Sequence, residues 1–218
     1  MTRSDRMSAW VAVVAILISL PGASMGAVPA SLIGQNLVVN GDAEAGPGLP
    51  QKNSTNVPGW TTTGHFTAVN YGYDDYPSTT SPGATDRGKN LFSGGTNDPI
   101  STASQSIDVT PLAASIDHGQ ITYAFSAWIG GYSSQADYAT VGATFYSATH
   151  ARLGGAILGP VTAADRQGLT ALLRRAKEGT LPAGTRSIGV KVTASRFEGS
   201  SNDGYTDNIS LVLSGPSK

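Results

Sequence analysis

The clearest fold signal in the sequence is the run Ile121-Thr122-Tyr123-Ala124-Phe125-Ser126-Ala127-Trp128-Ile129. Large and small apolar residues alternate with polar or mixed ones, so that Ile121, Tyr123, Phe125 and Ile129 share one face. A period of two residues is the pattern of a strand with one face in a core. The run therefore predicts a β-strand that packs its odd-numbered side chains inward.

Similar short runs lie on both sides of this strand and are separated by clusters of turn-forming residues. We expect strands at Leu37–Val39, Gly88–Phe92, Ala103–Val109, Tyr138–Tyr146, Ile188–Val192 and Ile209–Leu213. The second and third of these would flank a turn at Gly94-Gly95. Many short strands with regular turns are typical of an all-β protein, here a two-sheet antiparallel β-sandwich.

The segment Leu169–Glu178 fits two structures. Its Leu, Ala, Arg and Lys content favours a short helix by propensity alone. The following residues, Leu181–Thr185, form a turn that leads into the predicted strand at Ile188–Val192, and a strand before that turn would pair with it. Because pairing in the folded protein often overrides helix propensity, we favour a strand.

The first 30 residues have the order of a secretory signal peptide. Arg3 and Arg6 precede the apolar run Val11–Leu20, and Pro21-Gly22 and small residues follow it. The apolar run is shorter than the roughly 20 residues of a membrane-spanning helix, and no later segment could span a bilayer. The sequence therefore predicts a signal peptide at residues 1–30 and one secreted domain at residues 31–218. The alternative for the first 30 residues is an uncleaved N-terminal anchor.

Composition narrows the classes of function. The chain has no cysteine, which excludes disulfides, thiol catalysis and cysteine-bound zinc, so an exported domain must rely on its core or on another metal. The formal net charge of −1 gives no basic surface for nucleic acid.

Oxygen-bearing side chains occur near both ends of the predicted domain. In an extended chain Asn40, Asp42 and Glu44 would share one face. If the first and last strands are neighbours, Asp207 joins them. Such a set of hard oxygen ligands suits calcium, although the same groups can instead cap turns.

The order of several motifs resembles bacterial carbohydrate-binding modules of the galactose-binding-like jelly-roll class. The motifs are Asn40–Glu44, Pro58-Gly59-Trp60, Gln105-Ser106-Ile107, Tyr123–Trp128 and Asp207–Leu211. The resemblance implies a jelly-roll sandwich with a structural calcium ion as cofactor, held by Glu44 and Asp207 and with Asp42 as a further candidate. The sequence departs from this family at Ala43, where an aromatic core residue is usual.

Two segments combine aromatic rings with planar polar groups, which is the chemistry that recognises sugars. In the first, Trp128 is followed by a glycine-containing stretch from which Tyr132, Gln135 and Asp137 could project. The second is the loop Tyr71–Tyr76, with Tyr73 and Asp74 as candidates. The alternative for these residues is packing within the protein, and for Trp60 and Trp128 a place in the core.

A catalytic function has little support in the sequence. The three histidines, His65, His118 and His150, have no metal-ligand spacing, and the adjacent Asp74 and Asp75 point to opposite faces of an extended segment. We therefore expect a secreted, non-catalytic module that binds carbohydrate or cell-wall glycan. The alternatives are an adhesion domain with an extracellular protein partner and a glycoside hydrolase with carboxylates from distant strands.

Overall fold

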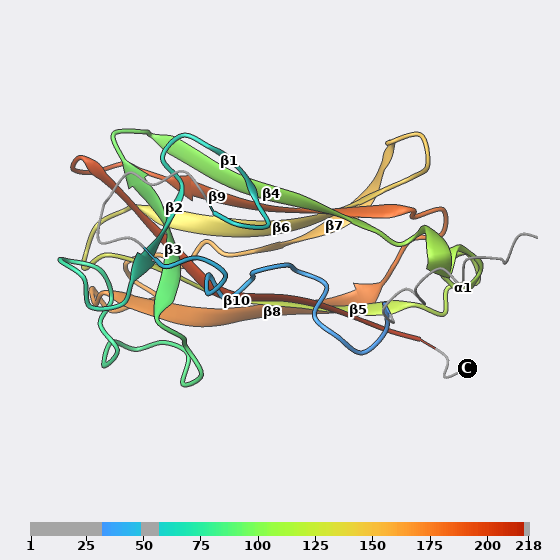
Figure 1. The fold of residues 1–218 in the computed structure, drawn as a ribbon, viewed down its shortest axis with the longest axis horizontal. Coiled ribbons are helices and arrows are strands. Elements are labelled where there is room, and N and C mark those ends of the chain that lie inside the picture. Colours follow the sequence, from blue (N-terminus) through green and yellow to red (C-terminus); the bar gives the residue numbers. More distant parts are fainter. Residues whose placement is uncertain (1–31, 49–56, 216–218) are drawn as a thin grey trace, which may run out of the picture. The chain divides into compact units, whose positions relative to one another are not determined.

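The structure, a computed structural model, describes residues 32–48 and 57–215, and its regular structure is mainly ten strands in two antiparallel sheets. Sheet I contains, in spatial order, β1 (Thr61–Thr63), β4 (Ile100–Asp108), β9 (Ser187–Ser195), β6 (Tyr138–Tyr146) and β7 (Arg152–Leu158). Sheet II contains β2 (Thr67–Asn70), β3 (Asn90–Thr96), β10 (Ser201–Ser214), β5 (Thr122–Gly131) and β8 (Ala171–Thr180). The two sheets lie as two layers (Figure 1), which confirms the predicted β-sandwich.

Helices play a small part in the described ranges. A 3₁₀ turn, η1 (Thr110–Leu112), leads into α1 (Ala113–Asp117), and both lie between β4 and β5. None of the helices in these ranges has the length and apolar character needed to cross a membrane. The predicted signal peptide, residues 1–30, lies outside the described residues.

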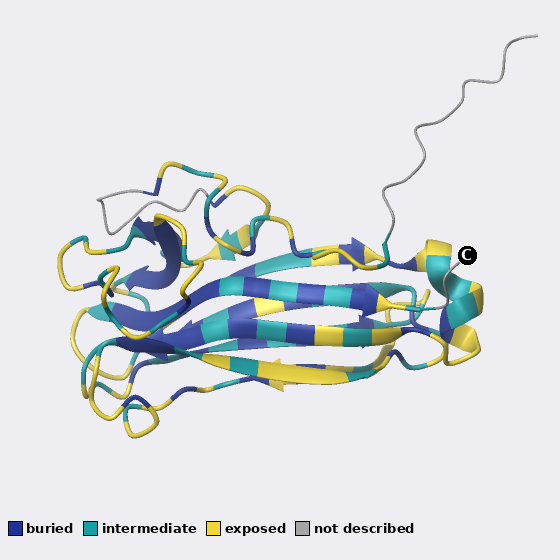
Figure 2. Ribbon diagram, turned by 90° about the horizontal axis from the view of Figure 1, so that it is seen from below, coloured by how far each residue is buried: buried dark blue, intermediate teal, exposed yellow. Residues whose placement is uncertain are grey.

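The inner faces of the sheets form the main core, as the sequence alternation predicted. In β5, Phe125, Ala127 and Ile129 are fully buried, whereas Thr122 and Ala124 on the opposite face are exposed. Strand β6 has the predicted bounds, and its side chains alternate between buried and half-buried along its length. Figure 2 shows the same alternation as bands along the central strands.

The turn predicted at Gly94-Gly95 is wrong. Gly94 and Gly95 do not form a turn but lie inside β3, and the chain turns after them at Asn97–Pro99 into β4 in the other sheet. The glycines serve close packing instead: a Cβ at Gly94 would lie 2.3 Å from the Asn202 side chain, and one at Gly95 would lie 1.9 Å from the His65 carbonyl oxygen.

From Ala171 on, the ambiguous segment at residues 169–178 is a strand, β8, but for a different reason from the predicted one. Strand β8 pairs with β5 along its whole length, from Thr122↔Thr180 to Gly131↔Ala171. The next strand, β9, belongs to sheet I, so the turn at residues 181–185 crosses between sheets and closes no hairpin.

The segment that was expected to open the domain as an extended strand is a series of turns. Asn40 and Ala43 have left-handed backbones, with φ of 49° and 61°, so the alternation argument for residues 40–44 is wrong. The expected meeting of this segment with the last strand is nevertheless present. The Leu37 amide donates to the Leu211 carbonyl at 2.9 Å, and the Ile209 amide donates to the Gly41 carbonyl at 2.8 Å.

The side chain of Asn36 closes the same seam. Its Nδ2 donates to the Ile209 carbonyl at 3.1 Å, and its Oδ1 accepts from the Leu211 amide at 2.9 Å. The two ends of the described domain are therefore joined by backbone and side-chain hydrogen bonds.

The seam leaves no room for a side chain at Gly41, which gives a stability prediction. A Cβ there would lie 2.1 Å from the Ile209 carbonyl oxygen, so Gly41→Ala must displace backbone. We expect a loss of about 1–3 kcal/mol, as for other overpacked sites. For a domain of this size that lowers Tm by about 2–4 °C per kcal/mol, measured by thermal unfolding.

Gly142→Ala is the matched control. Gly142 is half-buried in β6, and the atom nearest to an added Cβ would be 3.9 Å away, so Tm should stay the same or rise slightly. Equal Tm values for the two variants would contradict the tight seam.

Candidate functional site

A bulge in β10 turns polar and aromatic side chains to the outer face of sheet II, away from sheet I. The pairing of β10 with β5 shifts between Asp207 and Ser210, and Asn208 between them has a left-handed backbone with φ of 47°. After the bulge, Ile209 and Leu211 belong to the main core. Before it, Tyr205 belongs to a second apolar cluster, because one extra residue reverses the alternation.

The second cluster lies on the outer face of sheet II, since all its members come from that sheet or from loops adjoining it. Its buried members are Val69, Tyr76, Leu91, Leu172 and Tyr205, and the half-buried members are Tyr71, Tyr73, Trp128 and Tyr132. The two segments proposed from the sequence as separate binding loops therefore meet over one aromatic cluster.

Arg87 holds one of these loops in shape. Its guanidinium donates to the carbonyls of Ala84, Ser78 and Ser81 at 2.7, 3.0 and 2.9 Å. It also lies 5.3 Å from the centre of the Tyr71 ring, which is a cation–π distance. The loop that begins at Tyr71 is thus fixed against the sheet before any ligand binds.

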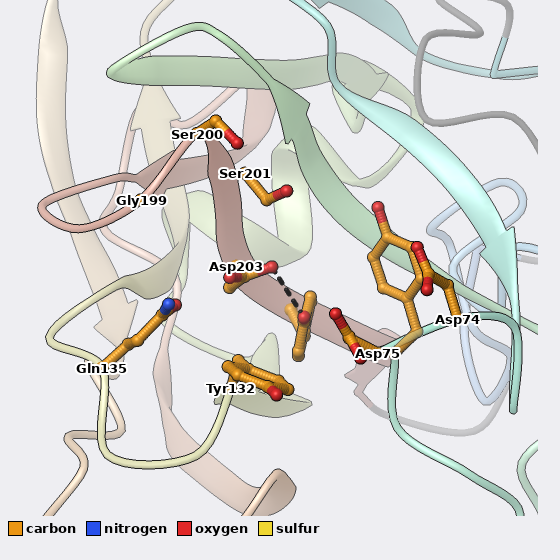
Figure 3. A pocket seen from close by; sticks show the side chains of 10 residues that line it. Asp74, Asp75, Tyr132, Gln135, Gly199, Ser200, Ser201 and Asp203 are labelled. Carbon is orange, nitrogen blue, oxygen red and sulfur yellow. Dashed lines mark hydrogen bonds between the residues drawn. The ribbon is translucent and has the colours of Figure 1, made fainter.

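A pocket opens beside the aromatic cluster, and we call it the tyrosine pocket. It has a volume of about 200 Å³ and is lined by Asp74, Asp75, Tyr76, Tyr132, Gln135, Gly199, Ser200, Ser201, Asp203 and Tyr205. Figure 3 shows Gln135 on one side, Asp74 and Asp75 on the other, and Tyr132 and Asp203 between them. Three regions distant in sequence therefore contribute to one concave site.

Three of the six predicted ligand residues line this pocket, namely Tyr132, Gln135 and Asp74. Tyr73 does not line the pocket, and its ring stacks on that of Tyr76 with centroids 6.5 Å apart. Trp128 lies in the second cluster instead of the main core, and it lines a separate depression next to Asn208.

The prediction that Asp137 projects from the rim is wrong. Its side chain is fully buried, and its Oδ1 accepts from the amides of Phe197 and Glu198 at 2.6 and 3.0 Å. Its Oδ2 accepts from the Asp203 amide at 3.0 Å. Asp137 therefore fixes the turn between β9 and β10, where amide groups would otherwise lack partners.

Arg166 supports the side of the pocket that is formed by Tyr132 and Gln135, a role that no sequence motif predicted. It is only 2% exposed, and its guanidinium donates to the carbonyls of Leu169 at 2.8 Å and Gln135 at 3.1 Å, and also to that of Ser133. Since these carbonyls belong to loops that flank the pocket, Arg166 keeps Tyr132 and Gln135 in position.

The start of β10 forms the floor of the tyrosine pocket, and the sequence patterns did not predict this role either. The Tyr205 hydroxyl donates to Asp203 Oδ1 at 2.8 Å. Burial raises the pKa of Tyr205, and the neighbouring charge of Asp203 raises it further, so the phenol keeps its proton and remains a donor. This bond orients the Asp203 carboxyl group within the floor.

The predicted metal residues lie near the seam, at a different place from the pocket lining. Asp207 is fully buried, and its Oδ2 accepts from the Tyr71 hydroxyl at 2.6 Å. Glu44 Oε1 accepts from the amides of Lys89 and Asn90, each at 2.7 Å. Asp42 is exposed, and its Oδ1 accepts from the Glu44 amide at 3.3 Å.

Burial raises the pKa of Asp207 to about 7. Hydrogen bonds from Tyr71 and the Asn208 amide oppose this rise, whereas the charges of Glu44 and Asp42 add to it. The electrostatics of this end of the domain therefore favour either a proton or a cation at Asp207.

The donor set fits a hard cation only in part. In residues 32–48 and 57–215, no group of three His, Cys, Asp or Glu side chains is arranged to hold a metal ion. The carboxyl oxygens of Glu44 and Asp207 are suitable calcium ligands, but carbonyl or water oxygens would have to complete the shell.

Among known proteins, only solved structures show a similarity to this chain, and the similarity is one of fold. No family model and no curated protein matches the sequence. Among solved structures, a family 16 carbohydrate-binding module is 21% identical over 81% of this chain and 99% of its own, with a TM-score of 0.51.

Two matches to larger proteins have lower scores. The enzymatically active domain of tailspike protein 4 from bacteriophage CBA120 is 14% identical over 82% of this chain, with a TM-score of 0.47, and the match spans 21% of that longer chain. A Clostridium thermocellum endo-1,4-β-D-xylanase, with a family 22 carbohydrate-binding module and bound xylohexaose, is 11% identical over 86% of this chain and 29% of its own, with a TM-score of 0.45. Residues 32–48 and 57–215 thus have the two-sheet β-sandwich fold of a carbohydrate-binding module.

Proposed function

We propose that this protein is an exported, non-catalytic module that binds carbohydrate in the tyrosine pocket. The observation that carries the proposal is the meeting of two aromatic loops and the start of β10 around one concave, polar site. The fold shared with a carbohydrate-binding module supports it. The signal-peptide order of residues 1–30 supports export.

The pocket offers both kinds of contact that a sugar ring needs. The half-buried Tyr132 presents an aromatic ring to the apolar side of a sugar, while the carboxylates of Asp74, Asp75 and Asp203 can accept hydrogen bonds from hydroxyl groups. Gln135 adds a planar amide whose Oε1 is buried and has no hydrogen-bond partner in the structure. A sugar hydroxyl could satisfy that atom once the Gln135 side chain turns toward the pocket, and the unpaired oxygen otherwise costs free energy.

A hydrolase is less well supported. Asp137, one of the carboxylates that could have served as a catalytic acid or base, is buried and accepts hydrogen bonds from three backbone amides. It does not line the pocket. Its geometry is that of a structural residue.

We also propose a structural calcium ion at the seam, with Glu44 and Asp207 as its carboxylate ligands. The buried Asp207 and the adjacent negative charges of Glu44 and Asp42 support a cation there. When bound, the ion would neutralise these charges and hold the two ends of the domain together.

The sugar-binding proposal predicts that Tyr132→Ala and Gln135→Ala each weaken binding without unfolding the protein. Loss of a stacking ring or of a hydrogen bond of about 1 kcal/mol should lower affinity by roughly 3- to 10-fold. Titration calorimetry with the polysaccharide fragment that the wild-type protein retains best measures the change.

Tyr146→Ala is the matched control, because Tyr146 is a half-buried tyrosine at the end of β6 in sheet I. Its affinity should equal that of the wild type. Unchanged affinity in Tyr132→Ala, or an equal loss in Tyr146→Ala, would rule out the tyrosine pocket as the binding site.

Asp137→Ala should instead lower stability, because three backbone amides lose their acceptor. At about 1–3 kcal/mol for each unsatisfied buried group, a total of several kcal/mol is expected from thermal unfolding. A fully stable Asp137→Ala variant would contradict the structural role.

The pKa of Asp207 sets the pH dependence of stability in calcium-free protein. The folded value of about 7 exceeds the ordinary 3.8, so between these values the folded chain holds a proton that the unfolded chain has released. Stability therefore falls as pH rises through this window, by up to about 4 kcal/mol. Thermal unfolding from pH 4 to 8 in the presence of chelator measures the fall.

Asp207→Asn is the matched variant, since it keeps the size of the side chain but does not ionise. Its Tm should depend less on pH over the same window, and added calcium should raise Tm at pH 8 only in the wild type. If chelation leaves the wild-type Tm unchanged, or if calcium stabilises both proteins equally, the calcium proposal fails.

A further inference from the structure

A second depression lies on the outer face of sheet II, and it shares no lining residue with the tyrosine pocket. Its volume is about 430 Å³, within the roughly 300–1,000 Å³ that is usual for ligand pockets. Strands β5, β8 and β10, which lie side by side in one layer (Figure 1), contribute to it together with the opening segment around Asp42. We call this depression the tryptophan site, after Trp128, which lines it.

Trp128 and Arg174 form one side of the tryptophan site. They are directly opposite each other in the pairing of β5 with β8, so their side chains project from the same face of the sheet. Trp128 is half-buried and packs against the second aromatic cluster, which includes Tyr205. The protein therefore holds the indole ring in place while part of the ring stays accessible to a ligand.

Two serines keep the floor of the tryptophan site low. Ser126 in β5 is paired with Ser210 in β10, and both residues are half-buried and line the depression. Because serine side chains are short, they leave open space beside the larger ring of Trp128. A hydroxyl group can both donate and accept a hydrogen bond, so this floor can bind another hydroxyl group in either direction.

The guanidinium of Arg174 is available to a ligand. Arg174 is exposed, and among the described residues its guanidinium has no hydrogen-bond or ion-pair partner. Its neighbour Arg175 differs, because it pairs with Asp165 at 3.6 Å. Arg87 differs too, since its guanidinium donates to three carbonyls of its own loop. The N–H groups of Arg174 can therefore donate to an oxygen atom bound beside the indole ring.

The other side of the tryptophan site has the opposite charge. Asn208, at the bulge of β10, donates from its Nδ2 to Asp86 Oδ1 at 3.1 Å, and Asp42 lines the depression from the opening segment. Both carboxylates are exposed and can accept hydrogen bonds from a ligand. An anion would be repelled by these aspartates and a cation by Arg174, so the lining suits an uncharged ligand that is rich in hydroxyl groups.

We propose that the tryptophan site is a second carbohydrate-binding site, which takes an uncharged sugar. In this arrangement the Trp128 ring contacts the apolar side of the sugar, and Arg174 donates hydrogen bonds to its hydroxyl oxygens. The inference shares its ligand class with the proposed function but does not depend on the tyrosine pocket, because the two sites have no residue in common. The outer face of sheet II thus has two separate places that contact glycan.

The indole Nε1–H of Trp128 gives a direct NMR readout of this site. Isotope-labelled protein is titrated with cellotriose, xylotriose and mannotriose, and the indole signal, assigned from its loss in Trp128→Phe, is followed. Calcium is kept constant in all solutions, so that the state of the seam does not change. We expect at least one trisaccharide to shift the signal along a saturating curve, which gives the Kd of the tryptophan site. Trigalacturonic acid, with a carboxylate on each unit, should bind about 3-fold more weakly or worse.

The variants Arg174→Ala and Tyr132→Ala separate the two sites. In Arg174→Ala, which changes an exposed side chain, the Kd read from Trp128 should rise roughly 3- to 10-fold, because hydrogen bonds to the sugar are lost. In Tyr132→Ala the same Kd should stay unchanged. Arg152→Ala, at an exposed arginine at the start of β7 in sheet I, is the matched control and should also leave it unchanged.

The outcomes for this inference and for the proposed function are distinct. A Trp128 signal that no trisaccharide shifts overturns the second site and leaves binding in the tyrosine pocket intact. An unchanged Kd in Arg174→Ala, or a Kd that rises as much in Tyr132→Ala, assigns the shift to the tyrosine pocket and also overturns the inference. Equal or tighter binding of trigalacturonic acid contradicts the uncharged ligand. A saturating Trp128 signal together with unchanged overall affinity in Tyr132→Ala supports the second site and overturns the tyrosine pocket instead.

Discussion

The structure depends on the seam between residues 33–41 and the second half of β10. Strand β3 pairs with β10 only over Ser201–Thr206, so the edge of β10 beyond the bulge needs another partner. The opening segment supplies it through the Asn36 side chain and the Gly41 carbonyl. Each buried backbone group left unpaired there would cost about 1–3 kcal/mol. The seam therefore completes sheet II and fixes the position of the loop that contains Glu44.

The bulge at Asn208 connects this seam to the candidate site. On one side of it, β10 contributes Ile209 and Leu211 to the main core; on the other, it contributes Tyr205 to the outer cluster. A regular strand could not do both with this sequence, because the spacing of these residues would place them on one face. One extra residue thus allows a single strand to build the core, bury Asp207 and form the pocket floor.

The sequence predicts local features well and distant ones less well. Strands β5 and β6 were predictable because burial follows their own alternation, and Tyr132, Gln135 and Asp74 were predictable as aromatic–polar loop residues. Strand β7 was not identified, since two glycines interrupt its apolar pattern at Gly154-Gly155.

Residues whose roles depend on the folded arrangement could not be found in this way. Asp203 and Tyr205 reach the pocket only because of the bulge, and Arg166 supports the wall from a segment with no pattern of its own. Asp137 was assigned to the rim because its amide partners come from a turn about 60 residues later in the chain.

Chemical-shift mapping by NMR tests the location of the binding site most directly. Isotope-labelled protein is titrated with the glycan fragment that it binds most tightly, and the backbone and Gln135 side-chain amides are followed. The largest shifts should occur at residues 74–76, 132–135 and 199–205, which surround the tyrosine pocket. Shifts concentrated on the outer face of sheet I, with those three segments unchanged, would contradict the account.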